Sequence, residues 1–184
     1  MKLGRFGVLL VTGLSLFIGV GVAATSPAQV VHAKAKTTLK TFPKSMRGTW
    51  YSYQDNTMYK YKITATKLVD NGFVERLHSR KMSYVVKHTE NSKHPSWFIA
   101  KNAKAKKQTW VTVWGWEQWG GDCAAYRVTT HKLGGHKVPV LQIAGGPATG
   151  YWTTRHGYHT KKLAKKYGNH YYKGERKHSL NQPM

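Results

Sequence analysis

The chain between Arg47 and Ala65 shows the clearest alternation of apolar and polar positions. Two strand-like runs are separated there by Gln54-Asp55-Asn56, a cluster whose side chains favour a turn. In the second run every other residue is apolar from Tyr59 onward, with lysines and threonines between. A period of two places alternate side chains on opposite faces, so this stretch predicts a β-hairpin with one buried face.

The same signals recur further along the chain, with strand-like runs separated by turns such as Asn71-Gly72 and Gly134-Gly135. The further runs are residues 67–70, 73–78, 82–88, 97–100, 108–116, 123–130 and 138–144, with a last short one at 171–172. Short strands at spacings of roughly 8–12 residues are typical of sandwiches and barrels. We therefore expect an all-β, mainly antiparallel fold of about eight strands that curls into a barrel.

One helix is predicted near the C-terminal end, over residues 160–168. Thr160 is its expected N-cap and Gly168 its C′ residue. Leu163, Ala164 and Tyr167 would form a single apolar stripe against the sheet, with lysines on the outer side. Residues 42–184 are then one β-barrel domain with a short C-terminal helix.

Residues 1–33 have the parts of a secretory signal peptide. Lys2 and Arg5 give a positive start, an uncharged apolar run extends from Phe6 to Ala24, and Val31-His32-Ala33 resembles a processing site. The alternative is a retained anchor, because a run of this length can span a bilayer. Residues 34–41 are polar and basic, which predicts a flexible arm.

Basic residues outnumber acidic ones by 30 to 7. Removing residues 1–33 takes away two basic and no acidic residues, which lowers the net charge from +23 to +21. This imbalance favours association with polyanions such as anionic cell-wall polymers, glycans, lipid head groups or extracellular DNA. The lysines expected to bind them are Lys101, Lys104, Lys106 and Lys107 in a loop and Lys161, Lys162, Lys165 and Lys166 on the helix. The alternative is that they only keep the surface solvated.

Four tryptophans follow one another closely, namely Trp110, Trp114, Trp116 and Trp119. Tryptophans on one face of a strand are expected to fill a barrel interior, or to wall a small ligand held there. The alternative is an aromatic platform beside cations that stacks on sugars or bases. Trp116 and Trp119 suit the platform best, because neighbouring glycines end the strand there.

Little in the sequence points to catalysis. Glu117 and Asp122 are the one carboxylate pair considered for glycoside hydrolysis, with loop charges as the simpler interpretation. His156-x-x-His159 has a metal-ligand spacing without a third ligand, so no metal or cofactor is expected. Cys123 is the single cysteine, which excludes an internal disulfide and predicts a buried thiol. No motif for sequence-specific nucleic-acid binding is present.

Gly48-x-Trp50 at the head of the first strand resembles the opening motif of lipocalins and other calycin barrels. In those families the tryptophan closes the barrel base beside an arginine from late in the chain, which implies Arg155 or Arg176 here. The opening from Phe42 to Tyr51 and the lysine-rich helix resemble small basic secreted proteins of lactic-acid bacteria. That resemblance implies a secreted location and a β-barrel fold, and it does not imply an activity.

These observations favour a secreted, non-enzymatic, cationic β-barrel that associates with the cell wall or other extracellular polymers and is peripheral to membranes at most. The alternative is a lipocalin-like carrier of a small apolar ligand. A cell-wall glycan hydrolase using Glu117 and Asp122 is the third hypothesis. Salt distinguishes the first two, because binding to a polyanion weakens with ionic strength and burial of an apolar ligand does not.

Overall fold

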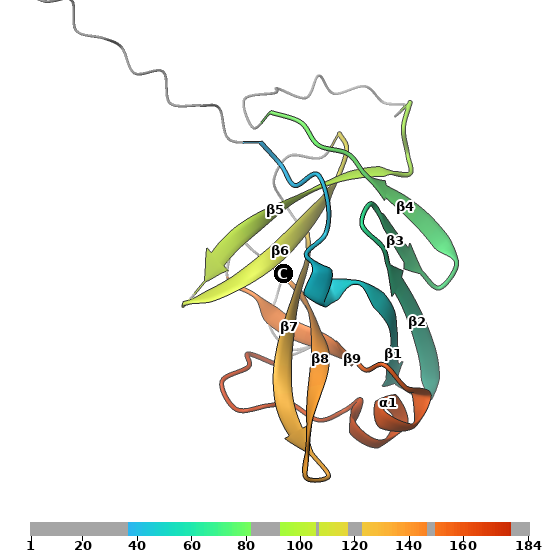
Figure 1. Ribbon diagram of the computed structural model, residues 1–184, viewed down its shortest axis with the longest axis vertical. Coiled ribbons are helices and arrows are strands. Elements are labelled where there is room, and N and C mark those ends of the chain that lie inside the picture. Colours follow the sequence, from blue (N-terminus) through green and yellow to red (C-terminus); the bar gives the residue numbers. More distant parts are fainter. Residues whose placement is uncertain (1–36, 82–92, 106, 118–122, 147–149, 178–184) are drawn as a thin grey trace, which may run out of the picture. The chain divides into compact units, whose positions relative to one another are not determined.

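The computed structural model describes residues 37–81, 93–105, 107–117, 123–146 and 150–177. The chain divides into two units, Met1–Ala33 and Lys34–Met184, and every described residue belongs to the second. Figure 1 shows this unit as one strongly curved sheet with a short helix beside it.

The sheet has nine strands, which lie side by side in chain order. They are β1 (Gly48–Gln54), β2 (Thr57–Ile63), β3 (Lys67–Asp70), β4 (Phe73–Leu77), β5 (Trp97–Ala105), β6 (Gln108–Gly115), β7 (Ala124–Leu133), β8 (His136–Gly145) and β9 (Trp152–Gly157). All neighbours pair antiparallel except β4 and β5, which pair parallel through Arg76 with Trp97 and Leu77 with Phe98. The expected strand at 82–88 lies outside the described residues, and no strand forms at 171–172.

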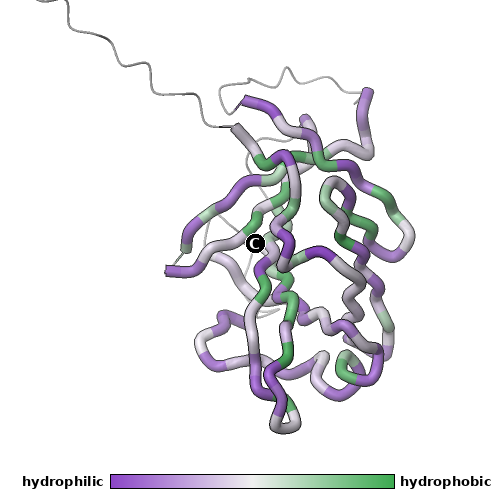
Figure 2. Tube along the Cα trace, in the orientation of Figure 1, coloured by the Kyte–Doolittle hydropathy of each residue, from purple (hydrophilic) through white to green (hydrophobic). Residues whose placement is uncertain are grey.

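The predicted hairpin turns are confirmed. Asp55 and Asn56 both have positive φ, 48° and 59°, as the two-residue turn between β1 and β2 requires. Asn71-Gly72 and Gly134-Gly135 also have positive φ and connect β3 to β4 and β7 to β8. Figure 2 shows apolar stretches interspersed with hydrophilic ones along the strands.

The sheet is not closed into a barrel, contrary to the expectation. Its first and last strands meet through one antiparallel bridge, between Tyr51 and Tyr158. The two backbone hydrogen bonds of this bridge measure 2.7 and 2.8 Å. The ladder stops there because β9 ends at Gly157 and helix α1 (Lys161–Tyr167) begins three residues after Tyr158.

The main core lies on the concave face of the sheet. It contains Trp50 from β1, Tyr61 from β2, Phe98 from β5 and Leu141 from β8, all buried. The 3₁₀ helix η1 (Lys44–Met46) precedes β1, and the Trp50 indole Nε1 donates to the Met46 carbonyl at 2.8 Å. This hydrogen bond fixes the large indole at the end of the core.

Neither arginine implied by the lipocalin resemblance covers Trp50. The imidazole of His159 stacks on the indole instead, with 3.8 Å between ring centroids. Arg155 faces another part of the concave side and donates to the Tyr61 hydroxyl at 2.8 Å. Arg176 belongs to the C-terminal segment, where its Nη1 lies beside Gly150.

Helix α1 begins at the predicted cap. The Thr160 hydroxyl accepts a hydrogen bond from the Leu163 amide at 3.2 Å. The other end differs, because Gly168 has a φ of −55° and is not left-handed. Glycine is required there because a Cβ would lie 2.2 Å from the Tyr53 carbonyl oxygen of β1. Gly168 therefore allows the helix end to approach the first strand.

The described end of the expected flexible arm packs on the sheet. The Thr38 amide donates to the Arg80 carbonyl at 3.0 Å, and the Leu39 amide donates to Ala100 at 2.7 Å. Phe42 is buried and its ring lies 5.7 Å from that of Phe98. The segment before η1 thus spans the junction of β4 and β5.

Candidate functional site

The predicted lysines form two separate groups. Lys161, Lys162, Lys165 and Lys166 are all exposed on α1. Lys104 and Lys107 are exposed near the tip of the β5–β6 hairpin, Lys101 is half-buried, and Lys106 lies outside the described residues. Figure 1 places this hairpin tip and α1 at opposite sides of the view, so the two groups do not form one patch.

Several of these lysines lie over aromatic rings. The Lys101 Nζ is 4.8 Å from the centre of the Trp114 ring. The Lys161 Nζ lies 5.8 Å from the Tyr51 ring, and the Lys166 Nζ 5.4 Å from the Tyr167 ring. Such contacts hold a cation beside a partly exposed ring.

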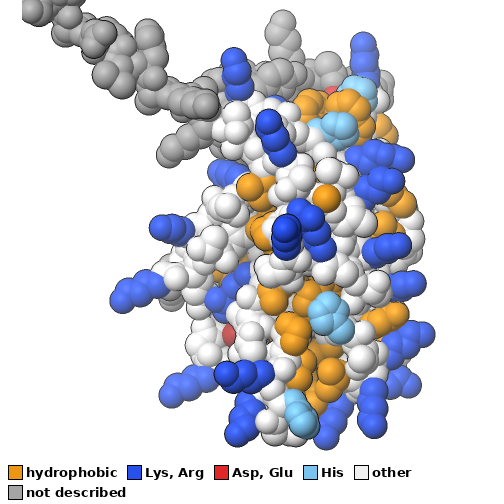
Figure 3. Space-filling model, in the orientation of Figure 1, with side chains coloured by type: hydrophobic (Ala, Val, Ile, Leu, Met, Phe, Trp, Pro, Cys, Tyr) orange, Lys and Arg blue, Asp and Glu red, His pale blue; other side chains and the backbone are white. Residues whose placement is uncertain are grey.

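The acidic residues have a different distribution. Figure 3 shows many Lys and Arg side chains on the visible face and few acidic ones. Glu175 is enclosed, with its side chain 3% exposed, and both of its carboxylate oxygens lie 2.9 Å from the His156 Nε2. Asp70 and Glu75 line a cavity on the concave side. These three carboxylates are thus enclosed or line a cavity, whereas Asp55 in the β1–β2 turn is exposed.

The concave-side cavity measures about 680 Å³. Asp70 and Glu75 reach it because they share one face of the β3–β4 hairpin, in which Asp70 pairs with Phe73 and Leu68 with Glu75. Phe73 stands at its rim and is 80% exposed, and Val74 beside it is 41% exposed. The cavity therefore combines an apolar rim with ionisable walls.

Arg155 is the cation of this cavity. It lies 4.1 Å from the centre of the Tyr59 ring and donates to the Tyr61 hydroxyl and to Gln54. Burial raises the pKa of Asp70, and the nearby Arg155 opposes that rise. Burial also raises the pKa of Glu75, with a further contribution from Asp70.

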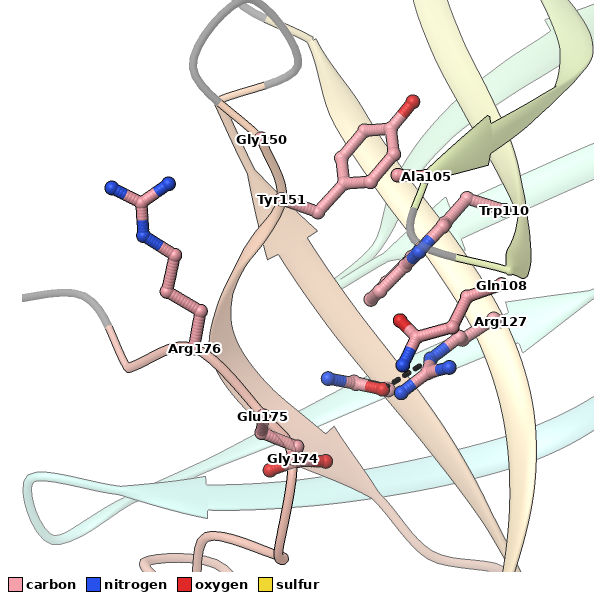
Figure 4. Close-up of a pocket in the computed structure, with 10 residues that line it drawn as sticks. Ala105, Gln108, Trp110, Arg127, Gly150, Tyr151, Gly174, Glu175 and Arg176 are labelled. Carbon is pink, nitrogen blue, oxygen red and sulfur yellow. Dashed lines mark hydrogen bonds between the residues drawn. The ribbon is translucent and has the colours of Figure 1, made fainter.

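A second cavity, of about 150 Å³, lies on the opposite face of the sheet. Trp110, Arg127 and Gln142 line it from β6, β7 and β8, together with Tyr151 and the segment 174–176. Figure 4 shows Trp110 between Tyr151 and Arg127. The Arg127 guanidinium lies 4.6 Å from the Trp110 ring, and the Tyr151 ring 4.9 Å from it.

Trp110 does not fill the concave core, contrary to the expectation. Val111 and Val113 of β6 do so, which places Trp110 on the other face with Ala125 and Ala144. Trp110 is 2% exposed, so its ring is not an open platform. Trp114 and Trp116 are half-buried, and Trp119 lies outside the described residues.

Trp116 belongs to an aromatic cluster that sequence reasoning missed. The Trp97 ring lies between His78 and His94, with centroids 3.6 and 3.7 Å away, and Trp116 meets it edge-on at 5.3 Å. Burial lowers the pKa of His78, as do the neighbouring His94 and Arg76. His94 is three residues before Trp97, whereas the parallel β4–β5 pairing brings His78 to it and the antiparallel β5–β6 pairing brings Trp116. No local motif signals the two strand pairings.

The remaining candidate residues occupy separate places. His156 is bound to Glu175, whereas His159 stacks on Trp50 and its Nδ1 lies 2.9 Å from the Thr49 carbonyl. The described residues contain no group of three metal-ligating side chains. Glu117 is half-buried, and its expected partner Asp122 lies outside the described residues. Cys123 is buried, as expected.

Within the described part of the chain, no helix is both long and apolar enough to cross a bilayer. No family model, no curated protein and no solved structure matches this chain.

Proposed function

We propose that residues 34–184 act as a secreted, cationic, non-enzymatic protein that associates with anionic polymers of the bacterial envelope. Residues 1–33 serve as its signal peptide, and it resides at the cell wall. This is the setting of the small basic secreted proteins of lactic-acid bacteria that its sequence resembles. Association needs neither a cofactor nor a metal.

The observation that supports this proposal best is the lack of compensating carboxylates at the lysine groups. The four lysines of α1, and Lys104 and Lys107 of the hairpin, have no carboxylate within 4.0 Å among the described residues. Glu175 is enclosed with His156, and Asp70 and Glu75 line the concave-side cavity. These lysines therefore remain available to a polyanion, which gains entropy by releasing its counterions.

The test is binding of the purified protein to cell walls, with and without their teichoic acids, over a series of salt concentrations. We expect the logarithm of the binding constant to fall linearly with the logarithm of salt, and binding to require the anionic polymer. Salt-insensitive binding, or equal binding to walls stripped of the polymer, would contradict the proposal.

Two matched variants test the part played by α1. One carries Lys161→Gln, Lys162→Gln, Lys165→Gln and Lys166→Gln. The control carries Lys44→Gln, Lys60→Gln, Lys62→Gln and Lys67→Gln, which are exposed lysines elsewhere. Both variants lose four positive charges, so an effect of net charge alone would weaken wall binding equally in the two. We expect the α1 variant to lower the salt slope more, by roughly one for each lysine that contacts a phosphate.

The concave-side cavity favours a second candidate function, the carriage of a small molecule. Its volume of about 680 Å³ lies in the range of ligand sites, and Phe73 gives it an apolar rim. Its walls are ionisable, so we propose an amphipathic ligand, with its apolar end at Phe73 and a polar end near Arg155. Mass spectrometry of a solvent extract of the purified protein tests for it, and Phe73→Ser should lower the yield of ligand. An extract without a bound compound would oppose this function.

A further inference from the structure

The 150 Å³ cavity lies between the sheet and the C-terminal segment. Three neighbouring strands build its floor, and residues 174–176 cover it on one side (Figure 4). It is far larger than the roughly 10–15 Å³ that one water needs. Its walls combine aromatic rings with fixed polar groups, as small-molecule sites do.

One wall presents a buried donor. The Trp110 indole is 2% exposed, and its Nε1 has no hydrogen-bond partner within the described ranges. Buried polar groups in folded proteins are almost always satisfied, and an unmet one is costly. An acceptor placed in this cavity would satisfy the Nε1.

Arg127 provides the second donor, and its orientation is fixed. Its Nε donates to the Gln142 side-chain oxygen, and the Gln142 amide nitrogen donates to the Thr153 hydroxyl. Gln142 and Thr153 are both 1% exposed, so the chain of hydrogen bonds is enclosed. The stack of the guanidinium on Trp110 holds it further. Its two terminal nitrogens make no hydrogen bond with any described residue, which leaves the planar fork available.

Glu175 also lines the cavity and brings a negative charge to it. Both carboxylate oxygens contact His156, and one of them accepts a hydrogen bond from the Tyr172 amide at 3.0 Å. The carboxylate thus has no hydrogen bond to Arg127 among the described residues. Burial lowers the pKa of the Arg127 guanidinium, and the charge of Glu175 opposes that shift. Arg127 is the cation that faces Trp110, since the Arg176 guanidinium points away from them in Figure 4. The Arg127 fork and the Trp110 Nε1 are donors, which suit an anionic oxygen, and the Gln108 amide beside them offers both a donor and an acceptor.

We propose that this cavity binds a small molecule through a carboxylate or phosphate group, received by the Arg127 guanidinium and the Trp110 Nε1–H. A guanidinium binds such groups through two parallel hydrogen bonds. Tyr151 and Ala105 pack against the remainder of the ligand. This inference does not rest on the envelope proposal, because none of the surface lysines lines the cavity.

The test uses calorimetric titration of the whole purified protein with inorganic phosphate and with acetate, at constant ionic strength maintained with chloride. We expect saturable binding of at least one of the two, and the better ligand identifies the group. Trp110→Phe keeps an aromatic ring at this position but removes the indole N–H. It should weaken binding about tenfold, as expected for one hydrogen bond to a charged group. Arg127→Gln should abolish it.

Lys104→Gln is the matched control, since it removes one positive charge at an exposed lysine outside the cavity. It should leave binding of the small anion unchanged. Unsaturable binding, an unchanged affinity in Trp110→Phe, or an equal loss in Lys104→Gln would each overturn the proposal. If Arg127→Gln fails to fold, the affinity of Trp110→Phe for the anion alone tests the proposal. Wall binding measured on the folded variants separates this site from the envelope proposal, which predicts no loss in Trp110→Phe.

Discussion

The indole of Trp50 stacks on the imidazole of His159, with ring centroids 3.8 Å apart and an interplanar angle of 28°. Trp50 lies in the first strand, and His159 follows the last strand directly before α1. The pair therefore joins the two ends of the sheet close to the Tyr51–Tyr158 bridge. Where the lipocalin resemblance implies an arginine, this chain uses a histidine.

His159→Ala removes the stack without emptying the core, because the imidazole itself is exposed. We expect the free energy of unfolding to fall by about 0.5–1.5 kcal/mol, the typical value of an aromatic pair. Urea denaturation measures it. His136→Ala, an exposed histidine at the start of β8, is the control and should change little. Equal losses in the two variants would show that the stack adds nothing.

Gly168→Ala should destabilise the protein, although glycine-to-alanine changes at relaxed positions usually stabilise. The new Cβ would lie 2.2 Å from the Tyr53 carbonyl oxygen, so the helix end must move away from β1. We expect a loss of about 1–3 kcal/mol in unfolding free energy. Lys162→Ala, at an exposed helical position, serves as the control. A gain in stability at Gly168 would mean that the helix end is not held against β1.

Asp70→Asn should raise the melting temperature at pH 7. Burial raises the pKa of Asp70, so the folded protein favours the neutral carboxyl. The stability from this preference is complete below the ordinary pKa of about 4 and is lost as pH rises through the folded value. The advantage of the variant should therefore vanish near pH 3. Thermal unfolding from pH 3 to pH 7 measures it, with Glu117→Gln as a carboxylate control outside the cavity.

His78→Phe should make stability depend less on pH between 5 and 8. Burial lowers the pKa of His78, so its neutral form is favoured in the fold. The contribution of His78 is complete above the ordinary histidine pKa of about 6.5 and is lost as pH falls from there through the lowered pKa of the folded protein. Phenylalanine keeps a ring against Trp97 but cannot titrate. Urea midpoints at pH 5 and pH 8 should lie closer together in this variant, and an unchanged difference would contradict the prediction.

The local parts of the fold could be predicted from the sequence, because each depends on adjacent residues. Asp55-Asn56 and Asn71-Gly72 specify turns by their tolerance of positive φ. Thr160 caps the helix through a residue three positions away. Strand β9 was missed, because its residues Thr153 to His156 show no alternation of apolar and polar types.

The two cavities could not be predicted, because their residues come from distant parts of the chain. Asp70 and Arg155 meet only through the curvature of the whole sheet. The expectation that Trp110 fills the barrel interior was wrong, because both sides of β6 are largely apolar and alternation does not show which one faces the main core. Packing under the C-terminal segment settles it, and that segment carries no periodic signal.

The junction of β4 with β5 affects how this sheet opens. These strands share two residue pairs, whereas β7 and β8 share nine. Thr38 and Leu39 connect the two sides through the hydrogen bonds to Arg80 and Ala100. Local opening starts where pairing is short, so we expect this junction to open more readily than the β7–β8 hairpin. Amide protons beside this junction should exchange with solvent at a lower free energy than those of the β7–β8 hairpin.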